Sequence, residues 1–195
     1  MKLLNYYEII FLWLLIILAL YYVFKHEYKI IKSIALMFVF SLLPAFARTF
    51  FRIKIDMFSI LLYFVILFMA MYLGSSLKFY DKYKWWDRSI HFLSGAGFVG
   101  FGIAIISLNP GISKWAVIFF GATFSITLHV IWEILEYISD CLTHGNAQRW
   151  QKINANNNHL SEKALQPSGL VDTMNDFICC IVGVIPAVLL WSIAL

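Results

Sequence analysis

Residues 115–138 decide the fold class, and they read WAVIFFGATFSITLHVIWEILEYI. The hydrocarbon core of a bilayer is about 30 Å thick and needs about 20 predominantly apolar residues per helix, so this run is long enough to cross it. The sequence therefore predicts an all-α fold, a polytopic transmembrane bundle of about six helices that forms one integral-membrane domain over residues 1–195. The five other helices are expected at about 5–24, 31–48, 57–74, 89–108 and 171–195.

The composition supports this class. Of the 195 residues, 62% are hydrophobic and 13% are charged, whereas a soluble domain has about 45–50% apolar and about 25% charged residues. This excludes an ordinary soluble enzyme. The net charge of +4 comes from basic residues in short segments between the apolar runs, which indicates membrane topology and not nucleic-acid binding. Three cysteines cannot form an even disulfide framework.

The basic residues also predict an orientation. The first, third and fifth loops carry ten Lys and Arg, against five at the termini and in the other two loops. The positive-inside rule then places both termini outside and the long loop, about residues 139–170, in the cytoplasm. The first helix contains Glu8 and lacks a small-residue cleavage site, so we expect a retained helix and not a removed signal peptide. Arg48 and Arg52 fall at the opposite interface, where snorkelling explains them.

One set of polar residues lies at helix ends on a single side of the membrane, because there the fourth helix begins, the fifth ends and the sixth begins. The spacing i, i+4 puts Asp87 on one helical face with His91, and it does the same for Asp172 and Asp176. Convergence of these helix ends on one site is the natural interpretation. The full set is Asp87, Arg88, His91, His129, Glu133, Glu136, Asp172, Asn175 and Asp176.

The charge of this set demands compensation. At about 6 Å and an effective dielectric constant of about 20, each like-charge pair costs about 3 kcal/mol. Either several carboxyl groups are protonated, as in a proton relay, or cations are bound. Carboxylates and imidazoles on facing helices are typical of metal sites in helical bundles. We expect one or two divalent ions of Zn, Mn or Fe. The predicted ligands are Asp87, His91, Glu133, Glu136, Asp172 and Asp176.

Simpler interpretations exist for some members. Asp87 and Asp172 stand where helix N-caps are expected, so capping explains either one alone as well as ligation does. His129 is either a ligand or a neutral histidine bonded to a neighbouring helix. Glu133 and Glu136, one turn apart, have no capping role within their apolar run, and intramembrane acids are functional by default. His144 and His159 fall in the long loop and are expected to be solvated.

Three segments resemble the YjdF-like family of bacterial inner-membrane proteins of unknown function. They are LGSSLKFY (73–80) with WWDRSIHFLSG (85–95), WEILEY (132–137) with Asp140, and GLVDTMND (169–176). The resemblance spans about residues 35–190 and implies a fold, a site and a place in the bacterial cytoplasmic membrane, but no established reaction. The positions that match the family's polar motifs are Asp87, His91, Ser94, Glu133, Glu136, Asp172, Thr173 and Asp176.

The leading functional hypothesis is a metal-dependent membrane hydrolase that acts at the cytoplasmic interface on a lipid or lipid-linked substrate. Glu133, Glu136 and Asp176 are the expected catalytic residues, and Arg88 and Ser94 are expected to bind the substrate. One alternative is a cation or proton transporter that uses the same carboxylates. Another is a non-catalytic scaffold or immunity protein whose acids hold a structural ion.

Overall fold

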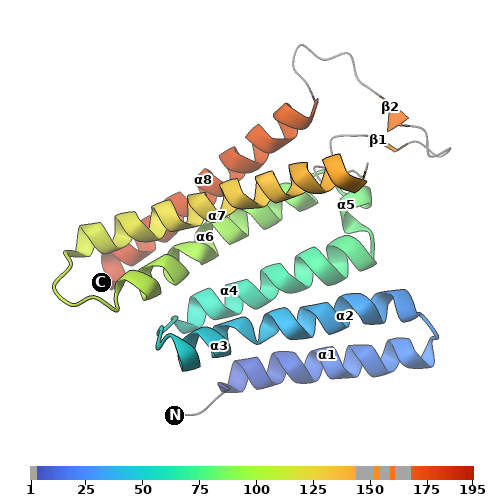
Figure 1. Cartoon of the computed structure of the whole chain (residues 1–195), viewed down its shortest axis with the longest axis horizontal. Coiled ribbons are helices and arrows are strands. Elements are labelled where there is room, and N and C mark those ends of the chain that lie inside the picture. The colour runs from blue at the N-terminus through green and yellow to red at the C-terminus, as the bar shows by residue number, and fades with distance from the viewer. Residues whose placement is uncertain (1–3, 144–151, 154–158, 161–167) are drawn as a thin grey trace.

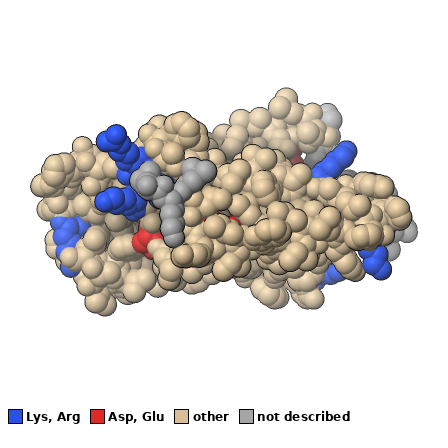
Figure 2. Space-filling view, turned by 90° about the horizontal axis from the view of Figure 1, so that it is seen from below, with Lys and Arg blue, Asp and Glu red and all other residues tan. Residues whose placement is uncertain are grey.

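Among the residues that the structure describes, six helices are long and apolar enough to cross a membrane, which confirms the predicted all-α class. The spans are Tyr6–Phe24, Tyr28–Phe50, Met57–Ser76, Trp86–Ile106, Lys114–Thr143 and Gly169–Ala194. The computed structural model describes residues 4–143, 152–153, 159–160 and 168–195. Lys and Arg gather towards the two ends of the long axis, and the middle of the molecule is free of them on the face drawn (Figure 2). This is the distribution expected of a protein whose middle contacts lipid tails.

The N-terminal half is a layer of antiparallel helices. It consists of α1 (Tyr6–Phe24), α2 (Tyr28–Ser41), the short α3 (Leu43–Phe50), α4 (Met57–Leu67) and a π-helical continuation, η1 (Phe68–Ser76). The single helix predicted at 31–48 is divided at Leu42. Pro44 explains the break, because proline has no backbone N–H group to donate a hydrogen bond in a helix interior and is tolerated only in a first turn. The core of this layer is formed by Phe11, Leu15, Tyr22, Ile34, Met37, Ile60, Phe64 and Leu67.

The C-terminal half contains α5 (Phe79–Lys82), α6 (Trp86–Ile106), α7 (Lys114–Thr143) and α8 (Ser168–Ala194). The α6 helix is central, since it packs against α4 on one side and against α7 and α8 on the other (Figure 1). A two-residue antiparallel pair, β1 (Lys152–Ile153) and β2 (His159–Leu160), lies in the segment between α7 and α8. The start of α6, the end of α7 and the start of α8 lie at the same end of the molecule.

Glycines allow α6 and α8 to cross closely. A Cβ atom on Gly95 would meet the backbone of Cys180, and one on Gly183 would meet the backbone carbonyl of Phe92. Small residues at such crossings allow the dispersion contacts that drive helix association in lipid. Asp176 lies one helical turn before Cys180, and His91 lies one turn before Gly95, so this crossing determines how the polar ends of the two helices meet.

A buried ion pair joins the N-terminal helices at the opposite end of the molecule. Arg48 of α3 donates from Nη1 to Glu8 Oε1 at 3.0 Å and from Nη2 to Glu8 Oε2 at 2.7 Å. The Glu8 side chain is only 1% exposed, and its Oε2 also accepts from the backbone N–H of Asn5 at 2.6 Å. Snorkelling therefore does not explain Arg48, because a two-pronged pairing with a buried acid fixes its position.

We expect Gly95→Ala to lower the free energy of unfolding in detergent by about 1–3 kcal/mol, and the unfolding temperature with it, because the new methyl group would overlap the α8 backbone. Gly97→Ala is the matched control on the same helix, since its Cβ meets only the Leu62 and Ile66 side chains at 3.3–3.5 Å. Equal thermal unfolding temperatures for the two variants would contradict the close crossing.

Replacing Arg48 by Met is expected to cost about 3–5 kcal/mol of folding free energy, because Glu8 is then left buried without its partner. The double variant Glu8→Leu, Arg48→Met should recover most of this loss, since it leaves no uncompensated charge. Arg52→Met, a change at an exposed arginine of the same segment, serves as the control. Chemical unfolding of the four proteins in one detergent gives the comparison.

Candidate metal site

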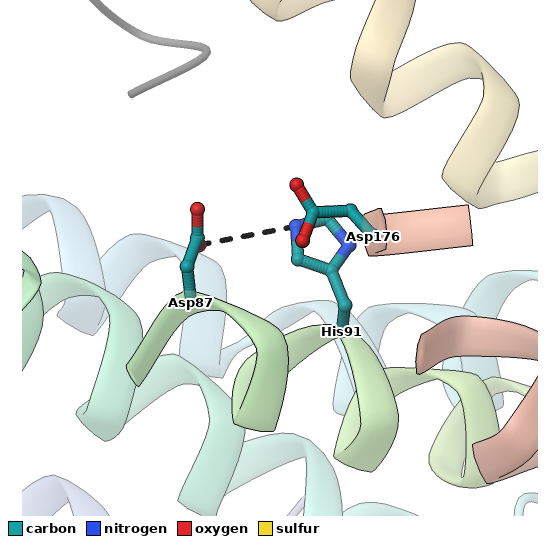
Figure 3. A group of neighbouring side chains, drawn as sticks. All are labelled: Asp87, His91 and Asp176. Atoms are coloured by element: carbon teal, nitrogen blue, oxygen red, sulfur yellow. Dashed lines mark ion pairs between the residues drawn. The ribbon is translucent and has the colours of Figure 1, made fainter. Parts of the chain in front are cut away.

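Three of the predicted ligands meet between α6 and α8. Asp87 and His91 are one turn apart on α6, and Asp176 reaches them from α8 (Figure 3). One ligand atom from each residue lies within 4.8 Å of the others. The His91 and Asp176 residues are 4% and 2% exposed, so both are removed from solvent. A group of one imidazole and two carboxylates is a donor set that first-row divalent ions accept.

Glu133 of α7 adjoins this group through His91. The His91 Nε2 atom lies 3.8 Å from Glu133 Oε1 and 3.9 Å from Asp87 Oδ1. Both separations are longer than a hydrogen bond. The other carboxylate oxygen of Glu133, Oε2, accepts from the Thr173 hydroxyl at 3.0 Å, which ties α7 to α8. Thr173 therefore orients Glu133 and leaves Oε1 directed towards the imidazole.

Two buried polar atoms of this site lack a hydrogen-bond partner among the described residues. They are Nδ1 of His91 and Oε1 of Glu133, and the Glu133 residue is only 5% exposed. Buried polar atoms are almost always satisfied, so each exception needs an explanation. Ligands about 2.0–2.2 Å from a metal ion lie about 3–4 Å from one another. Imidazole and carboxylate donors suit a divalent cation, and the separations of 3.8 and 3.9 Å from His91 Nε2 to Glu133 Oε1 and Asp87 Oδ1 fall within this range.

The remaining predicted ligands, Glu136 and Asp172, lie around this group and not in it. Both are partly buried, and Glu136 Oε1 accepts from the Trp132 indole at 2.7 Å. Together with Asp87 and Glu133 they act electrostatically on Asp176, so five carboxylates influence one another here. Their roles as ligands, and that of Glu136 in catalysis, stay predictions.

Capping does not account for Asp87 or Asp172. The N-cap of α6 is Trp85, and Asp87 lies inside the first turn. The α8 helix begins at Ser168, one turn before Asp172. Both helices start earlier than the predicted residues 89 and 171. In each case the apolar run that served for the prediction begins after the helix does. The capping interpretation is therefore wrong for both residues, although Asp87 still complements the positive end of α6.

The start of α6 is held by η1. The Trp86 indole donates to the backbone carbonyl of Met69 at 3.3 Å, and Trp86 packs with Ile66 and Ile90. Segments of π-helix occur frequently at functional sites. This contact anchors the residue directly before Asp87, so the N-terminal layer helps to position the site.

His129 forms a hydrogen-bonded connection between α6 and α7, one turn deeper than Glu133. Its Nδ1 lies 2.9 Å from the Ser125 carbonyl, and its Nε2 lies 2.8 Å from the Ser94 hydroxyl. The Ser125 hydroxyl in turn donates to the Gly95 carbonyl at 2.8 Å. Because both ring nitrogens are engaged, these contacts favour the hydrogen-bonded histidine over the ligand. It fixes the register of α6 against α7 and hence the distance from His91 to Glu133.

Ser94→Ala is expected to destabilise the protein by about 1–3 kcal/mol, because it leaves His129 Nε2 buried without a partner. The double variant Ser94→Ala, His129→Leu should cost less than the sum of the two single changes, since it removes both polar groups. Ser89→Ala, at a serine of α6 that bonds only to the Trp85 carbonyl, provides the control. Additive losses in unfolding free energy would disprove the connection.

Other predicted residues have varied positions. Ser94 is buried and bonded within the protein, whereas Arg88 is exposed at the start of α6. Their substrate-binding roles stay predictions. His144 lies outside the described residues, and His159 belongs to β2. The cysteines, Cys141, Cys179 and Cys180, are all free, as expected.

Comparison with known families settles the relationship of the chain. The family model described as predicted membrane protein (DUF2238) matches residues 7–195. The chain belongs to this family. DUF2238 is the YjdF family, so the resemblance seen in the polar motifs is confirmed. No curated protein and no solved structure matches the chain. Membership supports a membrane protein with several apolar helices and carries no reaction with it.

Proposed function

We propose that this protein is a metal-dependent membrane hydrolase that acts on a lipid or lipid-linked substrate. The observation that supports it best is the buried group of Asp87, His91 and Asp176, with Glu133 beside it. A buried imidazole and a buried carboxylate that each keep an unpartnered atom are costly unless a ligand completes them. Three helices, α6, α7 and α8, each contribute at least one acid or imidazole to this group. Burying several ionisable side chains together costs free energy, so folding alone does not account for the group.

The residues divide into roles. Asp87, His91 and Asp176 would hold a divalent ion of Zn, Mn or Fe, which supplies Lewis-acid polarisation of a phosphoryl or acyl oxygen. Glu133 is the general base, because Thr173 fixes one carboxylate oxygen while the other stays free to accept a proton from water. Glu136 and Asp172 would hold a second ion if two are bound.

The depth of the group favours a lipid substrate. Asp87 and His91 lie in the first two turns of α6, at the end where headgroups and ester bonds of a bilayer lie. The basic residues favour the cytoplasmic side of a bacterial membrane for this end. Transporters usually bind their ions near the bilayer midplane between inverted repeats. A site at one helix end favours an enzyme over a transporter.

Metal analysis of the purified protein tests the site first. We expect one or two equivalents of a transition metal in the wild type and at least about a tenfold lower affinity in Asp176→Asn and His91→Gln, because each removes a ligand. Asp81→Asn changes an exposed acid of α5 and should bind as the wild type does. If two ions are bound, Glu136→Gln or Asp172→Asn should release one.

Activity and folding then separate the candidate functions. An enzyme should lose turnover in Glu133→Gln while its thermal stability stays close to that of the wild type, with lipid vesicles as substrate and products identified by mass spectrometry. If the ion is only structural, the variants that lose metal should also give a lower yield of folded protein. A metal-free wild type that moves protons or cations across vesicle membranes would replace the hydrolase by a transporter.

A further inference from the structure

Arg88 is a cation in an acidic neighbourhood. It directly follows Asp87 and is exposed. Neither its guanidinium nor its main-chain N–H group has a hydrogen-bond or ion-pair partner among the residues that the structure describes. It acts electrostatically on Cys179, three residues after Asp176, so it lies towards α8 and the metal group. Its charge is thus available to an anion.

The backbone at this point also favours an anion. The α6 helix is 21 residues long, and Trp85 provides no side-chain cap. The first N–H groups of a helix have no acceptor inside it and carry the positive end of the helix dipole. An N–H group and a guanidinium on the same residue together match the oxygens of a phosphate. No other described residue of the site combines the two.

A second observation ties this position to a ligand. His91 lies three residues beyond Arg88, and its Nδ1 is buried and has no hydrogen-bond partner among the residues that the structure describes. A phosphate ester that bridges Arg88 and an ion held by Asp87, His91 and Asp176 would have anionic oxygens on both sides. The geometry therefore combines a recognition group with the reacting position.

The surface below Arg88 is apolar. Phe92 lies one turn deeper on the same helical face, and it and Trp85 are exposed large hydrophobic residues. A free phosphate has no apolar group that could contact this surface, whereas a phospholipid has acyl chains directly beneath its phosphate. We propose that Arg88 binds the phosphate of a phospholipid headgroup beside the metal group. This inference rests on the proposed function and names its substrate class.

Lipid retention by the purified full-length protein tests this inference. The wild type, Arg88→Gln, Arg88→Lys and the control Lys84→Gln are exchanged into nanodiscs of phosphatidylcholine with a titrated fraction of phosphatidylglycerol, and bound lipid is measured by native mass spectrometry. We expect about tenfold weaker retention of phosphatidylglycerol in Arg88→Gln, the loss of a charge-assisted pair. Arg88→Lys should be intermediate, because an ammonium lacks the planar fork. Lys84→Gln, at an exposed neighbouring lysine, should match the wild type.

Three results would overturn the proposal. Equal retention in Arg88→Gln and the wild type would show that Arg88 has no role, and equal losses in Arg88→Gln and Lys84→Gln would indicate surface charge alone. Displacement of the lipid by equimolar inorganic phosphate would identify free phosphate as the ligand. Metal content is measured on the same samples. A metal-free wild type would contradict the proposed hydrolase, whereas unchanged metal with unchanged lipid retention would contradict only the role of Arg88.

Discussion

The close crossing of α6 and α8 at Gly95 and Gly183 is the constraint on which the site depends. Because the two backbones are in contact, α6 and α8 can pack in only one register. This register decides how Asp176 meets His91, one turn before Gly95, and Asp87, two turns before it. This crossing therefore brings Asp176 of α8 to face His91 of α6. Since hydrophobic attraction between helices is absent in lipid, packing of this kind carries the organisation that a soluble core provides elsewhere.

The site is held by polar contacts that surround it from several helices. Thr173 orients Glu133 from α8, and His129 with Ser94 sets α7 against α6. Trp86 connects the start of α6 to the π-helical end of the N-terminal layer. These neighbours have their hydrogen bonds satisfied, whereas Nδ1 of His91 and Oε1 of Glu133 find no partner in the part of the chain that the structure describes. That contrast distinguishes a supporting shell from a binding position, because an unsatisfied buried atom is stable only if something else completes it.

The apolar runs were sufficient to predict six spans and the fold class, because the bilayer sets a minimum apolar length for every helix that crosses it. Convergence of Asp87, His91 and Asp176 was also predictable, since helix ends on one side of a membrane share a depth. The division of the acids was not. Glu133 and Glu136 are three residues apart on the same helix, yet Thr173 and Trp132 direct them to different surroundings. Such differences arise from rotamers and partners on other helices, which spacing alone does not contain.

Arg48 illustrates the same limit at the opposite end of the molecule. Its position in the chain is compatible with snorkelling, and only the fold brings it to Glu8, 40 residues away. A charge in a membrane protein reaches the interface, finds an opposite charge, is neutralised by a change of protonation, or binds a ligand. Arg48 takes the second course, because the fold supplies Glu8. Arg88 takes the first, beside a group of acids that the fold gathers without a described basic partner in their midst, and this contrast with Arg48 supports the proposed ligand.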